Sequence, residues 1–166
     1  MSVGNGGRSE YDTVKQEYIS STSVNDKEAC LQALSRSKDR ELARDFLEFV
    51  TSEAVPIQDS HHGANGISTN NYTRDEIWDF TKTEWKRLND RLGVSKICLD
   101  RWMKMGLDHF ASNEIERDIA EFFEDKDTRG FDRALVVISD TIKSNASYQA
   151  RDEGLVLEWL EAHGYL

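Results

Sequence analysis

The chain has 166 residues, of which 38% are hydrophobic and 31% are charged, and its formal net charge is −10. This length suits one domain with a sizeable core, and the single proline argues against a linker or a disordered tail. Acidic residues outnumber basic ones by 31 to 21 without any basic cluster, which argues against nucleic acid as a partner because phosphate binding requires a basic stripe.

Neither a membrane segment nor a secretory signal is visible in the sequence. No apolar run approaches the roughly 20 residues that cross a bilayer, so no membrane partner is expected. The opening residues, MSVGNGGRSEYD, contain no apolar stretch of the kind found in signal peptides. Cys30 and Cys98 lack ligand-like spacing and are expected to be buried thiols in a reducing compartment, which predicts a cytoplasmic location.

The first third of the chain predicts three amphipathic helices. Residues 1–7 are expected to be disordered, and the first helix to run from about Arg8 to Tyr18. Asn25 and Asp39 are the polar residues expected to begin the second and third helices. The positions expected to face the core are Tyr11, Val14, Tyr18, Cys30, Leu31, Leu34, Leu42, Phe46, Phe49 and Val50.

The segment EAVPIQDSHHGANGISTNN, residues 53–71, gives no clear pattern. Pro56 suits the first turn of a helix, whereas Gly63 and Gly66 have poor helix propensity. Local sequence leaves helix and loop equally open here.

The middle of the chain predicts one long helix. Thr73 and Glu76 have the spacing of a capping box, and Gly93 is expected to end the helix. Apolar and small side chains at spacings of three and four then form one stripe. The members of this stripe are Trp78, Thr81, Trp85, Leu88 and Leu92.

Four more helices are predicted after Gly93. They begin at Ser95, at Ser112 or Asn113, after Gly130, and at about Ala150. Their expected core positions are Cys98, Trp102, Met105 and Phe110; Ile115, Ile119, Phe122 and Phe123; Phe131, Leu135, Val137, Ile138 and Ile142; and Leu155, Val156, Trp159 and Leu160.

Eight or nine helices joined by short turns favour antiparallel neighbours. The predicted fold class is therefore all-α, a single domain over residues 1–166 built as an armadillo/HEAT-like stack of antiparallel helix pairs, which forms part of a curved α-solenoid. A compact helical bundle is the alternative.

The sequence contains no recognisable catalytic or metal-binding constellation. A helical zinc site of the HExxH type needs two histidines one turn apart, whereas His61 and His62 are adjacent and point about 100° apart on a helix. His109 and His163 are isolated, and neither a GxSxG elbow nor a phosphate-binding glycine loop occurs. We therefore expect no catalytic residue and no metal ligand in this chain.

Four stretches resemble one known family. FFEDKDTRGFDRALVVISDTI, residues 122–142, resembles the closing segment of zinc aminopeptidases of the puromycin-sensitive and aminopeptidase N type. NGGRSEYDTVKQEY, KEACLQALSRSKDRELARDFLEFV and IWDFTKTEWKRLNDRL are similar, in order, to earlier motifs of the same region. QDSHHGANGIST also looks like the fungal cytosolic members, which implies a helix over this ambiguous stretch. The resemblance covers residues 5–163.

The resemblance implies a noncatalytic role for this chain. In that family the HExxH zinc site and the GAMEN-type motif belong to a catalytic domain, and neither motif occurs here. The zinc would therefore belong to the parent's catalytic domain, with no cofactor in this chain. The implied partners are that catalytic domain, whose substrate chamber this domain would close, and the peptide substrate.

The same resemblance singles out a few side chains. Arg36 matches an arginine that holds the far end of the peptide in the endoplasmic-reticulum relatives; the alternative, which the sequence favours, is that it only offsets exposed carbonyls at a helix C-terminus. Another basic position of those relatives falls near Ile67 and Ser68, which are uncharged. Asp132, Arg133, Trp78 and Trp85 match structural motif positions; Asp132 suits the helix dipole, and Arg133 is expected to form an ion pair.

Two alternatives accompany this interpretation. In the first, the chain is a free-standing helical-repeat adaptor that binds a partner protein in a concave groove. A solenoid that begins in mid-stack would also expose an apolar end, so we expect that the chain either self-associates through its N-terminal helices or is a truncated product that needs a partner.

Overall fold

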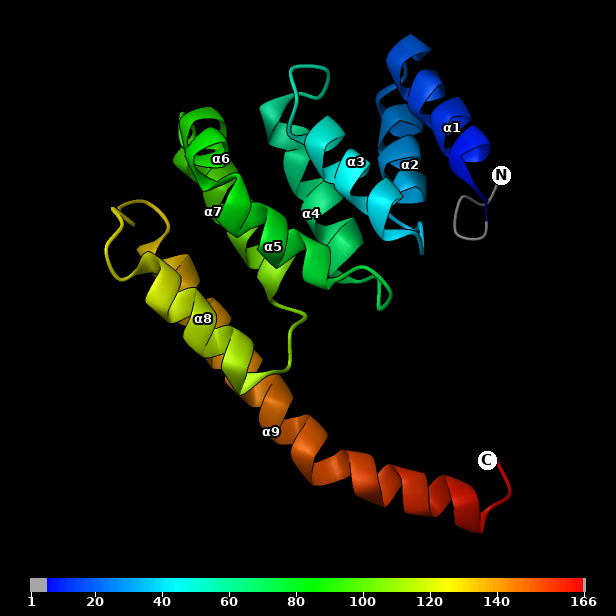
Figure 1. Ribbon diagram of the computed structural model, residues 1–166, viewed down its shortest axis with the longest axis vertical. Helices are drawn as coiled ribbons and strands as arrows, with labels where there is room; N and C mark the ends of the chain where they lie inside the picture. Colours follow the sequence, from blue (N-terminus) through cyan, green and yellow to red (C-terminus); the bar gives the residue numbers. More distant parts are fainter. Residues whose placement is uncertain (1–5, 166) are drawn as a thin grey trace.

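The computed structural model describes residues 6–165, and within this range the protein is all-α, with nine α-helices and no strand (Figure 1). The all-α prediction is confirmed. Residues 1–5 of the predicted disordered segment lie outside the described residues, whereas Gly7 precedes the first helix and donates its amide to Glu10 Oε2 at 3.0 Å.

The helices are short, apart from the last. Their bounds are α1 (Arg8–Ser20), α2 (Val24–Leu34), α3 (Arg40–Val50), α4 (Ser60–Ser68), α5 (Asp75–Thr83), α6 (Trp85–Leu92), α7 (Lys96–Leu107), α8 (Asn113–Phe123) and α9 (Asp132–Ala162), with a 3-10 turn, η2 (Ile57–Asp59), before α4. None of the described helices is long and apolar enough to cross a membrane.

The helices pack in sequence-neighbouring pairs that follow one another along the molecule. Contacts within pairs join α1 to α2, α3 to α4, and α8 to α9, while α2, α4, α7 and α9 contact one another in succession. Figure 1 shows α1 at one end of this row and α8 with α9 at the other. This arrangement agrees with stacked helix pairs; the armadillo/HEAT-like assignment itself stays a prediction.

Helix starts are set by local side-chain caps where a short polar residue is present. The Asp39 carboxylate accepts from the Glu41 amide at 2.8 Å, and the Ser112 hydroxyl accepts from the Glu114 amide at 3.2 Å, as predicted. The prediction of Asn25 was wrong, because the chain becomes helical at Val24 and the cap is Ser23.

The predicted capping box at Thr73 and Glu76 was also wrong. The α5 helix begins only at Asp75, and the Thr73 hydroxyl is buried without a hydrogen-bond partner among the described residues. Glu76 is 1% exposed and pairs with the guanidinium groups of Arg40 and Arg44 from α3, at 3.2 Å and 2.5 Å. Glu76 therefore forms a buried ion pair with two arginines of α3 instead of capping α5.

The predicted long helix divides at Glu84 into α5 and α6. Trp78, Thr81, Leu88 and Leu92 are nevertheless all buried as predicted, and Trp85 is partly buried. Glu84 is the residue between the two helices, and its carboxylate accepts a hydrogen bond from Arg87 Nε at 2.8 Å.

Residues 57–68 of the ambiguous segment are helical, as η2 and α4, and the glycines of α4 allow close packing against its neighbours. A Cβ at Gly63 would lie 2.6 Å from Val50 Cγ2, and one at Gly66 would lie 2.2 Å from Ser35 Oγ. α4 contacts α2, α3, α5 and α7, and its Ala64 and Ile67 are fully buried. Tertiary packing therefore overrides the poor helix propensity of this stretch.

Two predicted core faces are correct in part, since Trp102 in the first and Ile138 and Ile142 in the second are buried as predicted. In α7, Leu99, Trp102, Met103 and Leu107 are buried, whereas the predicted Cys98 and Met105 are only partly buried. In α9, Ala134 is buried but the predicted Val137 is exposed.

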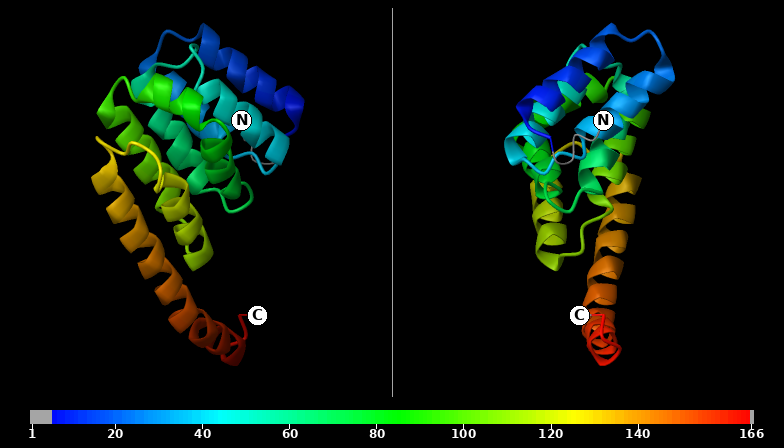
Figure 2. Two further views of the ribbon diagram at one scale, coloured as in Figure 1. Left: turned by 60° about the vertical axis from the view of Figure 1, so that its left-hand side comes forward. Right: turned by 90° about the vertical axis from the view of Figure 1, so that its right-hand side faces the viewer.

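The separate last helix expected from Ala150 does not exist, because α9 runs without a break to Ala162. Beyond Asn145 this helix projects past the other helices in every view, and we call residues 146–165 the overhang (Figure 2). Three positions predicted to be buried are exposed there, namely Leu155 at 64%, Val156 at 51% and Trp159 at 53%. The Trp159 ring stacks on His163 and Tyr165 of the same terminal segment, at 4.2 Å and 5.8 Å between ring centroids.

Two asparagines hold inter-helix turns of the stack in the same way. Asn70 Nδ2 donates to the carbonyls of Ser35 and Ser37 at 3.0 Å and 2.7 Å. Asn145 Nδ2 donates to the carbonyls of Asp108 and Phe110 at 2.9 Å and 3.0 Å. One side chain thus satisfies two main-chain acceptors at a turn where the preceding helix has ended.

The glycine packing yields a prediction with a matched control. Gly63→Ala should lower the free energy of unfolding by about 1–3 kcal/mol, because the new methyl group overlaps Val50. Gly154→Ala, also within a helix but with no atom within 4 Å of its Cβ, should raise it by about 0.5–1 kcal/mol. Urea unfolding followed by circular dichroism measures both; equal effects of the same sign would contradict the packing of α4.

Candidate functional site

Two of the four motif positions, Trp78 and Trp85, lie at a joint where α5 and α6 pack against α8 and the residue before α9. Trp78 packs edge-on against Phe122 at 5.4 Å between ring centroids, and Trp85 packs edge-on against Phe123 at 4.9 Å. Phe131, which precedes α9, lies 5.7 Å from Trp85. The aromatic residues of the FFEDKDTRGFDR stretch thus close this joint.

A carboxylate on α8 reinforces the joint. Asp118 Oδ2 accepts from Trp78 Nε1 at 2.7 Å and from Lys82 Nζ at 2.6 Å. The hydrogen bond from the Lys82 ammonium is the main reason that the pKa of Asp118 is lowered. Asp118 therefore binds two residues of α5 while it is ionised.

A second carboxylate links α8 to α9. Glu116 Oε1 accepts from Ser139 Oγ at 2.6 Å and lies 3.0 Å from Lys143 Nζ. The hydrogen bond from Ser139, followed by that from Lys143, lowers the pKa of Glu116.

The other two motif residues lie at the surface of this joint. Asp132 is in the first turn of α9 and accepts from the Gly130 amide at 3.4 Å, and Gly130 has a φ of 110° that favours glycine. Arg133 is exposed, and contrary to expectation it forms no ion pair or hydrogen bond with any residue in the range 6–165.

Arg36 lies apart from this cluster, in the turn between α2 and α3. Its amide donates to the Ala33 carbonyl at 3.3 Å, while its side chain is exposed and contacts no acidic group within the described range. Lys38 follows in the same turn and lies 4.7 Å from the Tyr72 ring. Ile67 and Ser68 stand near the position where the endoplasmic-reticulum relatives have another basic residue. Both are buried in α4, where the Ser68 hydroxyl donates to the Met105 carbonyl at 2.6 Å.

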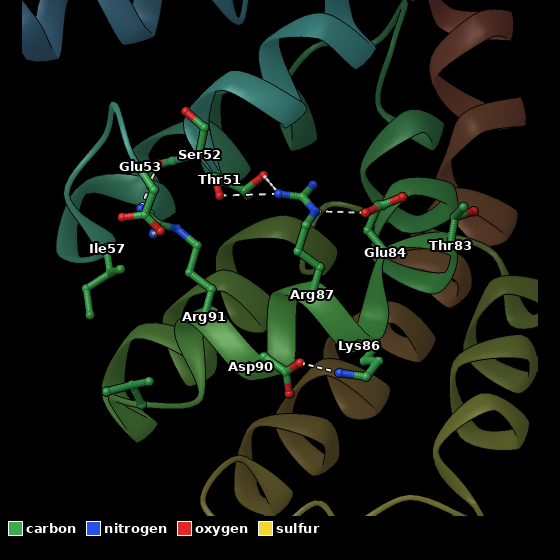
Figure 3. A pocket seen from close by; sticks show the side chains of 11 residues that line it. Thr51, Ser52, Glu53, Ile57, Thr83, Glu84, Lys86, Arg87, Asp90 and Arg91 are labelled. Carbon is green, nitrogen blue, oxygen red and sulfur yellow. Dashed lines mark hydrogen bonds and ion pairs between the residues drawn. The ribbon is translucent and has the colours of Figure 1, made fainter.

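A surface groove with a volume of about 950 Å³ lies between the end of α3 and α6 (Figure 3). Arg87 Nη1 donates to the Thr51 carbonyl at 3.3 Å, and Arg91 Nη2 donates to the carbonyls of Ser52 and Val55 at 2.6 Å and 2.8 Å. The two guanidinium groups therefore bind carbonyls of the turn that follows α3. This groove is a structural joint rather than an anion site.

The sequence patterns missed these polar joints. Asn70, Glu76 and Arg91 act on turns or helices more than 30 residues away, and no local spacing reveals such a partner. The sequence offered only two signals for the Glu76 contact. One is a glutamate directly before the apolar residues Ile77 and Trp78, and the other is a pair of arginines, Arg40 and Arg44, one helical turn apart.

The histidines do not form a site. The rings of His61 and His62 lie 4.2 Å apart, and desolvation followed by the neighbouring His62 lowers the pKa of His61. His109 pairs with the adjacent Asp108 at 2.6 Å. Among residues 6–165, no group of three His, Cys, Asp or Glu side chains is placed to hold a metal ion.

Exposed apolar side chains gather at one end of the molecule. The outward face of α1 is polar and is lined by Ser9, Asp12, Thr13, Gln16, Glu17 and Ser20. At the N-terminal end, where apolar surface was expected, Ile19 and Val24 are 54% and 79% exposed, and a larger group of exposed apolar side chains lies at the opposite end of the described chain, on the overhang of α9.

Comparison with known proteins supplies a context for this geometry. The family model described as ERAP1-like C-terminal domain matches residues 1–144. Alanine/arginine aminopeptidase of Saccharomyces cerevisiae is 30% identical over 160 residues, and the match covers 96% of this chain and 19% of that protein. Aminopeptidase 2, mitochondrial, of the same yeast is 30% identical over 160 residues, covering 96% of this chain and 17% of the relative. Human aminopeptidase N is 22% identical over 161 residues, with 95% and 17% covered.

These matches confirm the resemblance carried by the sequence motifs. The chain spans less than a fifth of the length of each of these relatives.

The Asp118 joint predicts an acid-dependent loss of stability. The pKa of Asp118 is lower in the folded state than in the unfolded state. Its contribution to the free energy of unfolding is therefore fully present above the unfolded pKa of about 3.9, and it is lost as the pH falls through the pKa of the folded state. Between pH 5 and pH 2.5, the urea midpoint of the wild type should therefore fall further than that of Asp118→Asn. Asp140→Asn, at an exposed position without hydrogen-bond partners in the described chain, should behave as the wild type; parallel curves for all three proteins would contradict the assignment.

Proposed function

The chain belongs to the family of ERAP1-like C-terminal domains, and on this premise we propose that it is the noncatalytic helical domain of a cytoplasmic zinc aminopeptidase. Residues 1–166 would form one domain whose role is to pack on the catalytic domain and close its substrate chamber. The observation that carries this proposal is the match along 96% of the chain to aminopeptidases about five times longer.

The internal chemistry of the chain supports this division of labour. Its strongest polar contacts join helices or satisfy main-chain carbonyls, as Asp118, Arg91 and Asn70 do. Such residues determine the shape of the domain and leave no activated nucleophile. The zinc, with the groups that act on the scissile bond, would be supplied by the catalytic domain. Long, collinear matches to aminopeptidases favour this role over that of a free-standing adaptor.

Peptide binding is the second part of the proposal. Arg36 is a charged, exposed side chain without an intramolecular partner in the described range, so its guanidinium is free to bind a carboxylate. A peptide that reaches from the zinc to this turn would offer its C-terminal carboxylate. Substrate length would then affect affinity through Arg36.

The chain alone should not hydrolyse peptides. Purified protein with zinc should show no turnover of aminoacyl-aminomethylcoumarin above the blank. When the chain replaces the matched region of S. cerevisiae alanine/arginine aminopeptidase, the chimera should hydrolyse that substrate, whereas the same enzyme without the region should not. Turnover by the isolated chain, or an inactive but folded chimera, would contradict the proposal.

Arg36 should matter only for long substrates. In that chimera, Arg36→Ala should raise KM for peptides of about ten residues by roughly 5–30-fold, because one charge-assisted hydrogen bond contributes about 1–2 kcal/mol. The KM for aminoacyl-aminomethylcoumarin should stay unchanged. Arg133→Ala is the matched control, as another exposed arginine without an ion pair among residues 6–165. An equal effect of both substitutions on both substrates would count against a role for Arg36.

A further inference from the structure

A groove runs along the α8–α9 pair, which lies at one end of the row of helices (Figure 1). Its volume is about 360 Å³, and its lining comes only from α8 with the residue that follows it, from α9, and from Thr128 in the turn between the two helices. Cavities that bind small molecules usually have volumes of about 300–1,000 Å³. The groove is therefore large enough for a small molecule.

The floor of the groove is apolar and belongs to the core. Ile119 and Phe123 of α8 and Ile138 and Ile142 of α9 line it, and each of these residues is at most 5% exposed. Val136 of α9, which is 61% exposed, also lines the groove. Because the floor consists of packed core side chains, the groove is already formed without a ligand. An aliphatic chain that lies in it is stabilised by burial of apolar surface.

Acidic side chains lie at both ends of the groove. At one end, Glu116 accepts from Ser139 Oγ at 2.6 Å, and Asp140, the next residue along α9, lines the groove beside them. At the other end, Glu124 directly follows α8 and lines the groove there. Glu116 and Glu124 are eight residues apart, which corresponds to about 12 Å along a helix. The two acidic ends are therefore separated by an apolar stretch of about this length.

The negative charge of the groove is compensated only in part. Lys143 lies 3.0 Å from Glu116, whereas Glu124 and Asp140 form no ion pair with any side chain among residues 6–165. In the same range, no lysine, arginine or histidine lines the groove. The segment 113–144, which includes both helices' contributions to the groove, contains nine acidic and five basic residues. The groove therefore favours an occupant with positive charge near each end.

We propose that this groove binds a linear aliphatic diamine or polyamine. The polymethylene chain lies on the apolar floor, one ammonium group pairs with Asp140 and the other pairs with Glu124. Such contacts are charge-assisted hydrogen bonds, which are stronger than those between neutral groups. This inference does not depend on the proposed function.

Other cations do not match both the length and the charge of the groove. A metal ion needs several ligands at one point, and no group of three His, Cys, Asp or Glu side chains in the described chain is placed to hold one. A monoamine pairs with only one of the two uncompensated carboxylates. A short diamine has both charges but does not span the roughly 12 Å between the acidic ends.

A titration followed by NMR tests the proposal with the whole chain, labelled with ¹⁵N, at low salt because salt screens exposed ion pairs. Octane-1,8-diamine should shift the amide signals of the residues that line the groove. It should bind about 10-fold more tightly than octan-1-amine or ethane-1,2-diamine, because each of these forms one ion pair fewer at the two ends. Octane-1,8-diol, which has the length without the charge, should cause no shift. Spermine should displace octane-1,8-diamine from the same residues.

Substitutions then test the two ends and the apolar wall. Asp140→Asn and Glu124→Gln should each weaken binding of octane-1,8-diamine by about 10-fold, to the affinity of octan-1-amine for the wild type. Val136→Lys should abolish binding, because it places an ammonium group in the groove. Glu121→Gln is the matched control, since this exposed glutamate of α8 does not line the groove, and it should leave the affinity unchanged. Circular dichroism should report unchanged helix content for all four variants, whose substituted side chains are exposed.

Three results would overturn the proposal. The first is the absence of any shift with octane-1,8-diamine. The second is an equal affinity for ethane-1,2-diamine, which would show attraction to the acidic surface in general. The third is an equal loss of affinity in Glu121→Gln and in the two groove variants, which would place the bound amine outside the groove.

Discussion

The close approach of α4 to its neighbours is the constraint on which the rest of the fold depends. This nine-residue helix contacts α2, α3, α5 and α7, so its surface must be nearly smooth on several sides. Gly63 lies against Val50 and Gly66 against Ser35, and on the α7 side Gly106 brings its backbone close to Ala64 and Ile77. Small residues at these positions lower the helix propensity of α4, but they allow four helices to pack closely around it. The helix pairs on either side take their positions from this contact.

Outside α4, the polar groups that matter connect helices instead of forming a reaction centre. Asn70 and Asn145 hold turns, Arg87 and Arg91 bind carbonyls of the turn after α3, and Asp118 joins α8 to α5. A domain built in this way offers a defined surface to other polypeptides. That property is what a wall of a substrate chamber requires, and it agrees with relatives in which this region is a small part of a much longer aminopeptidase.

Sequence patterns predicted most of the helices, because each buries one stripe of side chains with helical spacing. The stripe of Trp78, Leu88 and Leu92 was recovered even though a break at Glu84 divides its helix. The errors arose where distant contacts decide the outcome. Thr73 and Glu76 have the spacing of a capping box, yet Arg40 and Arg44 from α3 bind the glutamate and the helix begins elsewhere. The apolar spacing of Leu155 and Trp159 correctly indicated a helix, but spacing carries no information on whether a partner lies within the same chain. For the same reason the motif residues Trp78, Trp85 and Asp132 were recognisable, while the joint they form was not.

The central claim is that this chain contributes shape to an aminopeptidase while other polypeptide contributes the chemistry. A crystal structure of S. cerevisiae alanine/arginine aminopeptidase carrying this chain in place of its matched region, with a peptide bound, measures this directly. The account predicts that every ligand of the metal and every group within hydrogen-bond distance of the scissile bond belongs to the preceding polypeptide, with the α2–α3 turn facing the peptide. A metal ligand from His61, His62 or any carboxylate of this chain would contradict it.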